Sequence, residues 1–277
     1  IDYLTEQIMI NLPDTKMCHL KFQDEWLTIS LDNHKKKNAL SSKLIDELMK
    51  VLDLVRDEKE VRGILIKGQN DIFCSGADLD ELHQITYNKS QSKKMTIDMS
   101  TKIGQLLSLI DAIPKLTVSV IQGPCIAGGF GMACATDVII TMHDSVFRLP
   151  ETRLGLTPSQ IAPYVLRKID YSKARLLMLL GDSIDGKIAY DIGLADYLAT
   201  TKKEVQYHID QLKSKLNKCS PNAFAITKSL VSKHASKNIQ EAAELFYECV
   251  EHSQGKEGLK SFFEKRNPFW VNSRNKS

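Results

Sequence analysis

The sequence lacks long apolar runs and closely spaced metal-binding side chains, and each absence removes a class of protein. No hydrophobic segment approaches the length of a membrane-spanning helix, and residues 1–10 lack the basic start and long apolar centre of an export signal. The 7 histidines and 6 cysteines show no C-x-x-C, H-x-x-x-H or H-E-x-x-H spacing. We therefore expect a cytoplasmic protein with no metal site and no membrane partner.

Charge of one sign is also scarce, since the formal net charge is only +3. Short lysine runs such as Lys35-Lys36-Lys37 are not interleaved with aromatic residues, so we expect no nucleic-acid partner, although such a cluster could receive phosphates. A dinucleotide-binding G-x-G-x-x-G is incomplete, because Cys134 stands at its third glycine, and no phosphate-binding G-K-S/T follows the glycines. The cysteines lie largely in apolar runs, which predicts reduced, buried thiols.

What is present is an alternation of apolar strands and amphipathic helices, which predicts the α/β class. Residues 62–67 form a continuous apolar run of the kind buried on both faces of a parallel sheet. Ser41 and the spacing of the leucines after it predict a helix to about residue 57. Further strands are expected at 26–31, 116–121, 138–141 and 146–149. We expect a core over residues 1–200 and a helical region over 201–277, with a polar loop or lid over 83–100.

A glycine-rich bend at residues 122–137 organises the chain. It follows the strand at 116–121 and opens a short helix, which leaves backbone N–H groups unpaired at the helix start. A similar strand, bend and helix start occurs at residues 72–82, with Gly76 in the bend. Two such bends from neighbouring strands would place two N–H donors side by side and form an oxyanion site. The alternative is that the glycines only let a helix pack close to a sheet.

Several motifs in order resemble the enoyl-CoA hydratase/isomerase, or crotonase, family. They are Lys37-Asn-Ala-Leu40, Phe73-Cys-Ser-Gly-Ala-Asp78, the stretch from Gly123 to Asp137, Phe147-Arg-Leu-Pro-Glu151, Leu154-Gly-Leu156 and Phe262-Phe-Glu-Lys-Arg266. The resemblance covers nearly the whole chain. It implies a crotonase-like spiral of β-β-α units followed by a C-terminal all-helical trimerisation region, and a homotrimer or dimer of trimers.

The resemblance also implies roles for three residues. The amides of Ala77 and Gly128 would stabilise the thioester oxyanion, and Glu151 would carry the proton, with a pKa raised by an apolar acyl pocket. Ala77 could instead be an ordinary helix-start alanine, and Glu151 an exposed turn glutamate. Hydratases of this family usually present two glutamates, and the first falls on Gly131 here.

The substrate implied by the resemblance is an acyl-CoA thioester, with coenzyme A as part of the substrate and no separate cofactor. The residues expected to bind the coenzyme A portion are Lys35, Ser75, Asp78, Leu79, Phe262 and Lys265. The last two would often come from a neighbouring subunit, and Lys265 could equally be a solvated lysine at a helix end.

The residues leave three functions open. One is a hydratase that adds water to a 2-enoyl-CoA, and runs such as residues 149–165 resemble the methylglutaconyl-CoA and isohexenylglutaconyl-CoA hydratase branch. The second is a Δ3,Δ2-enoyl-CoA isomerase, for which one carboxylate suffices. The third is a non-catalytic module that binds acyl-CoA or an acyl carrier. The sequence favours the branched glutaconyl-type hydratase.

Overall fold

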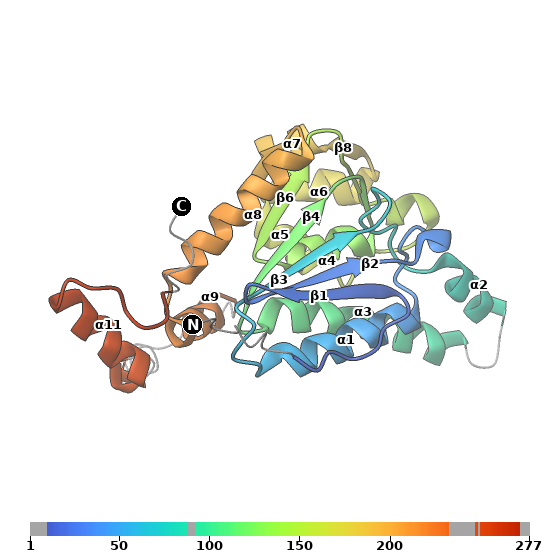
Figure 1. Cartoon of the computed structure of the whole chain (residues 1–277). Helices are drawn as coiled ribbons and strands as arrows, with labels where there is room; N and C mark the ends of the chain where they lie inside the picture. Colours follow the sequence, from blue (N-terminus) through green and yellow to red (C-terminus); the bar gives the residue numbers. More distant parts are fainter. Residues whose placement is uncertain (1–9, 88–91, 233–246, 249, 272–277) are drawn as a thin grey trace.

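The computed structural model describes residues 10–87, 92–232, 247–248 and 250–271, with a six-stranded sheet at its centre (Figure 1). The strands stand in the order β1-β2-β3-β4-β6-β9. β1 pairs antiparallel with β2, and the other neighbours pair in parallel, which confirms the expected α/β class. The strands are β1 (Cys18–Gln23), β2 (Trp26–Leu31), β3 (Gly63–Gly68), β4 (Leu116–Ile121), β6 (Val138–Met142) and β9 (Tyr197–Ala199).

A second sheet of three short strands, in the order β5-β7-β8, stands next to the first. Its strands are β5 (Pro124–Ile126), β7 (Val146–Arg148) and β8 (Ser183–Asp185). β5 begins three residues after β4 ends, so the chain passes from the large sheet into the small one immediately before the glycine bend. β5 and β7 run in parallel, and their ends therefore deliver the following residues to the same edge.

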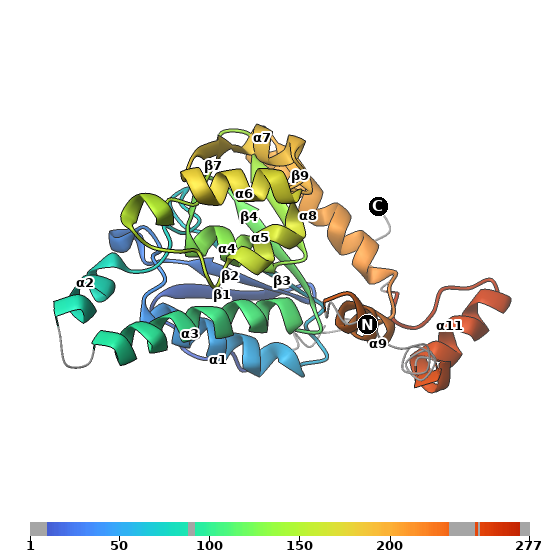
Figure 2. The ribbon, with the colours of Figure 1, turned by 180° about the vertical axis from the view of Figure 1, so that it is seen from behind.

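Helices cover both faces of the large sheet. α1 (Ser42–Arg56) and α3 (Ser92–Ala112) lie along one face, and α8 (Lys202–Asn217) crosses the other (Figures 1 and 2). The remaining helices are η1 (His34–Lys36), α2 (Leu79–Tyr87), α4 (Gly128–Ala135), η2 (Glu151–Leu154), α5 (Ala162–Lys168), α6 (Tyr171–Leu180), α7 (Gly186–Asp191), α9 (Pro221–Ser232) and α11 (Ser253–Phe263).

The sequence explains where helix α1 begins and which of its side chains are buried. Ser41 caps it by accepting a hydrogen bond from the Leu44 amide at 3.3 Å, as its position before the leucine pattern predicts. Six apolar side chains of α1 are fully buried against the sheet, and each such burial contributes roughly 1.5–3 kcal/mol. The buried side chains are Leu44, Ile45, Leu48, Val51, Leu52 and Val55.

Two expectations about secondary structure are wrong. The loop or lid expected over 83–100 is helical where the structure describes it, because α2 ends at Tyr87 and α3 already begins at Ser92. The first turns of α3 are mostly exposed, and Met99 is the first buried residue described there, so these turns have no apolar face to detect. The second expectation is that the chain after residue 164 is almost wholly helical, whereas it also contains β8 and β9, whose three-residue lengths are too short for a period-2 pattern.

After residue 201, α8 packs on the sheet and α9 is joined to the core by a buried lysine. Its Lys228 is 5% exposed and donates to Asp137 at 2.7 Å and to the carbonyl of Lys115 at 2.9 Å. α11 extends away from the sheet and is bound to the start of α9 through Gln254, which accepts a hydrogen bond from Ser220 at 2.7 Å (Figure 1). The helix expected over 239–252 lies mostly outside the described residues, and the domain boundary near residue 200 stays a prediction.

Candidate active site

Three chain segments run side by side toward one edge of the small sheet. Cys74 forms a parallel bridge with Cys125 of β5, and Ile126 of β5 pairs in parallel with Arg148 of β7. The amide of the next residue, Ala127, donates to the Arg148 carbonyl at 2.9 Å. Ala77 and Gly128 each lie three residues beyond the bridge between Cys74 and Cys125, and Glu151 lies three residues beyond Arg148.

The amides of Ala77 and Gly128 lie next to each other. A Cβ placed on Gly128 would lie 3.7 Å from the Ala77 nitrogen, and a Cβ on Gly76 would lie 3.4 Å from the Gly128 nitrogen. Among the described residues, neither amide donates a hydrogen bond to a protein atom. The structure therefore brings two unpaired N–H donors together, which is the geometry that an oxyanion site needs, while their catalytic role stays a prediction.

The backbone between the strands and these amides is unusual. Gly76 has φ of +94°, and a Cβ there would lie 2.7 Å from the Cβ of Ala127. Ala127 itself has φ of 51° and ψ of −120°, a conformation that L-residues rarely adopt. Such strain persists only where the surroundings impose it, and it clusters at functional sites.

Glu151 begins η2 directly after Pro150 and is 8% exposed. Its Oε2 atom is buried and has no hydrogen-bond partner. Burial raises the pKa of the Glu151 carboxyl, and a hydrogen bond from its own backbone amide offsets only part of that effect. The alternative of an exposed turn glutamate is therefore wrong, and the raised pKa is confirmed.

The space that a second carboxylate would need is filled. A Cβ on Gly131 would lie 2.1 Å from Cγ2 and 2.6 Å from Cβ of Ile161, which is itself 4% exposed. Ile161 lies at the N-terminal end of α5 and cannot move away without repacking. Glu151 therefore has no partner carboxylate at position 131, and the sequence did not reveal that Ile161 fills this place.

The residues expected to bind coenzyme A near the first bend differ in their exposure to solvent and in their hydrogen bonds. Lys35 is exposed in η1, and Leu79 is 55% exposed at the start of α2. Ser75 is half-buried and donates from Oγ to the carbonyl of Lys36 at 3.2 Å. Asp78 is 2% exposed, and its carboxylate caps the start of α2 by accepting from the Asp80 amide at 3.0 Å.

Lys36, which the sequence does not single out, forms ion pairs with carboxylates at the first bend. Its Nζ lies 2.7 Å from Oδ2 of Asp78 and 3.2 Å from Oδ2 of Asp80. These carboxylates raise the pKa of Lys36, chiefly through the hydrogen bond to Asp78. The lysine run was noticed, but the sequence does not show which of its members faces α2.

Phe262 and Lys265 are not near Glu151 in this chain. Phe262 is 77% exposed on α11, and Lys265 follows that helix with φ of 54°. α11 lies at the opposite end of the molecule from α2, which begins just after the first bend (Figure 1). A coenzyme A contact from these residues would therefore have to come from a second copy of the chain.

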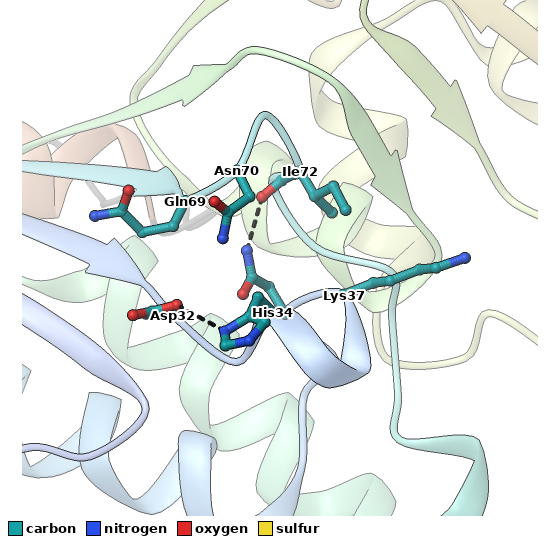
Figure 3. A pocket seen from close by; sticks show the side chains of 7 residues that line it. Asp32, His34, Lys37, Gln69, Asn70 and Ile72 are labelled. Carbon is teal, nitrogen blue, oxygen red and sulfur yellow. Dashed lines mark hydrogen bonds and ion pairs between the residues drawn. The ribbon is translucent and has the colours of Figure 1, made fainter.

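A polar cavity of about 560 Å³ opens beside η1, between that helix and the turn after β3 (Figure 3). Asn38 is one of the residues that line it and donates from Nδ2 to the carbonyl of Ile72 at 2.7 Å. Neither Glu151 nor the two unpaired amides line this cavity, so it is separate from the site above. The residues that line it are Asp32, His34, Lys37, Asn38, Gln69, Asn70 and Ile72.

The described residues contain no group of three or more His, Cys, Asp or Glu side chains placed to hold a metal ion. No helix among them is long and apolar enough to cross a membrane. The cysteines in this part of the chain are free thiols, and four of them are buried. The prediction of buried thiols is wrong for Cys219, which is exposed.

Comparison with known proteins agrees with this geometry. A family model described as enoyl-CoA hydratase/isomerase matches residues 21–273. A Bacillus subtilis protein named "Probable enoyl-CoA hydratase" is 30% identical over 250 residues, which cover 88% of this chain and 95% of that protein. The chain therefore belongs to the enoyl-CoA hydratase/isomerase family.

Solved structures support the same assignment. Pseudomonas aeruginosa AtuE superposes with a TM-score of 0.88 at 32% identity, covering 93% of this chain and 100% of that one. An enoyl-CoA hydratase/isomerase from Marinobacter aquaeolei superposes with a TM-score of 0.86 at 28% identity, covering 92% of this chain and 99% of that one. The crotonase-like fold and the prediction of an enzyme of this family are confirmed.

Proposed function

We propose that the protein adds water across the double bond of a 2-enoyl-CoA. The observation that carries this proposal is the buried Glu151 carboxylate, whose Oε2 has no hydrogen-bond partner and which follows the end of β7, the strand paired with β5 that leads to the unpaired amide of Gly128. The amides would accept the thioester oxygen as it gains negative charge, and each such donor typically lowers the barrier by about 2.7–4 kcal/mol.

In this reaction Glu151 would act twice. Its carboxylate would take a proton from water while the water oxygen bonds to C3, and electrons would move to the thioester oxygen as an enolate. The resulting carboxylic acid would then return the proton to C2 as the carbonyl re-forms. Burial raises the pKa of the carboxyl, which makes it a stronger base for taking the proton from water.

Mixing the purified protein with crotonyl-CoA tests this proposal, with loss of the conjugated enoyl absorbance as the readout. Glu151→Gln should abolish turnover, because the amide cannot accept a proton. Glu248→Gln, the same change at an exposed glutamate, is the matched control and should leave turnover unchanged. Activity that survives in Glu151→Gln would remove Glu151 from the mechanism.

For the acyl group, we propose a branched glutaconyl-type thioester, such as 3-methylglutaconyl-CoA or isohexenylglutaconyl-CoA. The resemblance of residues 149–165 and 219–228 to that branch supports it. A preference for 3-methylglutaconyl-CoA over crotonyl-CoA in kcat/KM is the expected result, and equal values would contradict it.

A second candidate is Δ3,Δ2-enoyl-CoA isomerisation, which the filled space at Gly131 favours because one carboxylate can move a proton between C2 and C4. Incubation with 3-hexenoyl-CoA distinguishes it, since an isomerase would produce the conjugated 2-enoyl thioester. A protein that binds these thioesters without converting any of them would be a non-catalytic acyl-CoA or acyl-carrier module.

The proposed active form is a homotrimer or a dimer of trimers, in which a neighbour's α11 completes the coenzyme A site. α11 and the residues after it expose several large apolar side chains, which a lone chain would leave in water. These are Leu259, Phe262, Phe263 and Phe269. Sedimentation equilibrium should give three or six chains, and Phe262→Ala with Lys265→Glu should raise KM for acyl-CoA. Within the chain, the proposed contacts with coenzyme A are Lys35, Ser75, Asp78 and Leu79.

The proposed compartment of the protein is the cytoplasm.

A further inference from the structure

The turn that carries Glu151 is tied to the end of α6 by the side chains on both sides of the glutamate. Three residues of the segment 148–153 donate hydrogen bonds to three consecutive carbonyls of the chain at the α6 C-terminus. The bonds run from Arg148 Nε to Gly181 O (3.0 Å), from Thr152 Oγ1 to Leu179 O (3.1 Å) and from Arg153 Nε to Leu180 O (2.6 Å).

These bonds satisfy groups that a helix cannot satisfy by itself. The last carbonyls of an α-helix have no intrahelical donor, and their partial negative charge favours cationic side chains nearby. Arg153 also pairs with Asp182, one residue beyond the helix cap. The end of α6 therefore acts as a fixed support for the turn.

Gly181 makes this close contact possible. It closes α6 with φ of +66°, and a Cβ there would lie 3.1 Å from both Cγ and Nε of Arg153. The stem of Arg153 lies directly on the glycine. Gly193, which follows α7 with φ of +80°, has the same backbone requirement but nothing within 4 Å of its Cβ position.

The support matters because the Glu151 carboxylate is held through its own backbone, from whose amide it accepts a hydrogen bond. Glu151 Oε2 has no hydrogen-bond partner, so the direction of the carboxylate depends on the backbone of η2. We propose that Arg153, assisted by Arg148 and Thr152, is a positioning residue that holds Glu151 in register with the amides of Ala77 and Gly128. Its effect on turnover rests on the proposed function.

The test compares Gly181→Ala with Gly193→Ala. Both variants place a Cβ on a residue with left-handed backbone conformation, but only the Cβ at position 181 would meet Arg153. We expect Gly181→Ala and Arg153→Gln to lower kcat roughly 10- to 100-fold while KM changes less than threefold, because misplacement by about 1 Å can cost 10²-fold. Arg153→Lys should recover part of kcat, since an ammonium can still reach one carbonyl. Gly193→Ala should retain wild-type kcat.

Hydrogen exchange of a peptide that spans residues 149–157 gives a readout that needs no activity. Faster exchange there in Arg153→Gln and Gly181→Ala, but not in Gly193→Ala, supports the anchoring even if wild-type protein hydrates no enoyl-CoA, in which case only the proposed function fails. Unchanged exchange together with unchanged kcat in Arg153→Gln overturns the anchoring. If Arg153→Gln does not fold, Thr152→Val and Asp182→Asn remove single bonds and are judged by the same two readouts.

Discussion

Replacing Gly131 by alanine tests the claim that Ile161 occupies the space of a second catalytic side chain. The added Cβ would lie 2.1 Å from Ile161 Cγ2 and 2.6 Å from Ile161 Cβ, well inside contact distance. Ile161 is buried and β-branched, so it cannot swing aside as a long flexible side chain would. We therefore expect Gly131→Ala to destabilise the fold although it lies within a helix, where alanine is normally preferred.

The magnitude follows from two opposing effects. Overpacking costs typically about 1–3 kcal/mol, and replacing glycine by alanine in a helix gains about 1 kcal/mol, so the free energy of unfolding should fall by about 0–2 kcal/mol. In an Ile161→Gly background only the Ile161 Cα remains nearby, at 3.5 Å, and Gly131→Ala should become stabilising by about 1 kcal/mol. Ile161→Ala should relieve only part of the clash, because its Cβ stays at 2.6 Å.

Urea unfolding at one protein concentration measures this coupling as a double-mutant cycle, with a predicted coupling of about 1–3 kcal/mol. Gly104→Ala is the contrast, because its Cβ would lie 2.3 Å from Oε1 of Gln160, the mobile end of a side chain. That variant should be neutral or stabilising. Additivity of Gly131→Ala and Ile161→Gly within about 0.5 kcal/mol would refute the reasoning.

Three further predictions concern the site and its support. Burial raises the pKa of Glu151 above 4.5, so its carboxyl contributes most to the free energy of unfolding below that pH, and this contribution is lost as the pH rises through the raised pKa. Glu151→Gln should therefore unfold at a higher urea concentration than wild type at pH 7, and the difference should vanish toward pH 4.5. Asp137→Ala leaves the buried Lys228 ammonium without its carboxylate and should lower the free energy of unfolding, measured in urea, by about 3–5 kcal/mol. A decrease of less than about 1 kcal/mol would mean that the ion pair contributes little to stability. Gly129→Ala places a Cβ 2.6 Å from the Cys74 carbonyl and should lower kcat about 10²-fold by shifting the second bend; an unchanged kcat would show that the bend tolerates it.

The adjacency of the two amides could be predicted from the sequence because a local pattern repeats. Strand, glycine bend and helix start occur twice, and parallel neighbours bring equivalent positions to one edge. The pattern predicts the two bends, and the resemblance to the family identifies Ala77 and Gly128 within them. The burial of Glu151 was not predictable in this way, since a glutamate after a proline reads as exposed until the surrounding family motifs are recognised.

Contacts between distant residues were beyond the sequence. Gly131 and Ile161 are thirty positions apart, and only the packing of α5 on α4 shows that one side chain fills the place of the other. Lys36 was hidden for a different reason. Three consecutive lysines look alike in sequence, and the left-handed conformation of Lys37 after η1 contributes to which of them faces α2.

The filled space at Gly131 and the anchoring of the η2 turn have a common physical logic. A carboxylate that must both accept and return a proton needs a pKa raised toward neutrality, and hydrogen bonds to the carboxylate would lower that pKa. Glu151 limits this effect, because its carboxylate accepts a hydrogen bond from its own backbone amide while Oε2 is buried without a partner. The bonds from its neighbours Thr152 and Arg153 to the end of α6 fix the backbone without adding a hydrogen bond to the carboxylate. With Ile161 excluding a second carboxylate, this separation of positioning from titration lets one glutamate serve both proton transfers of the proposed reaction.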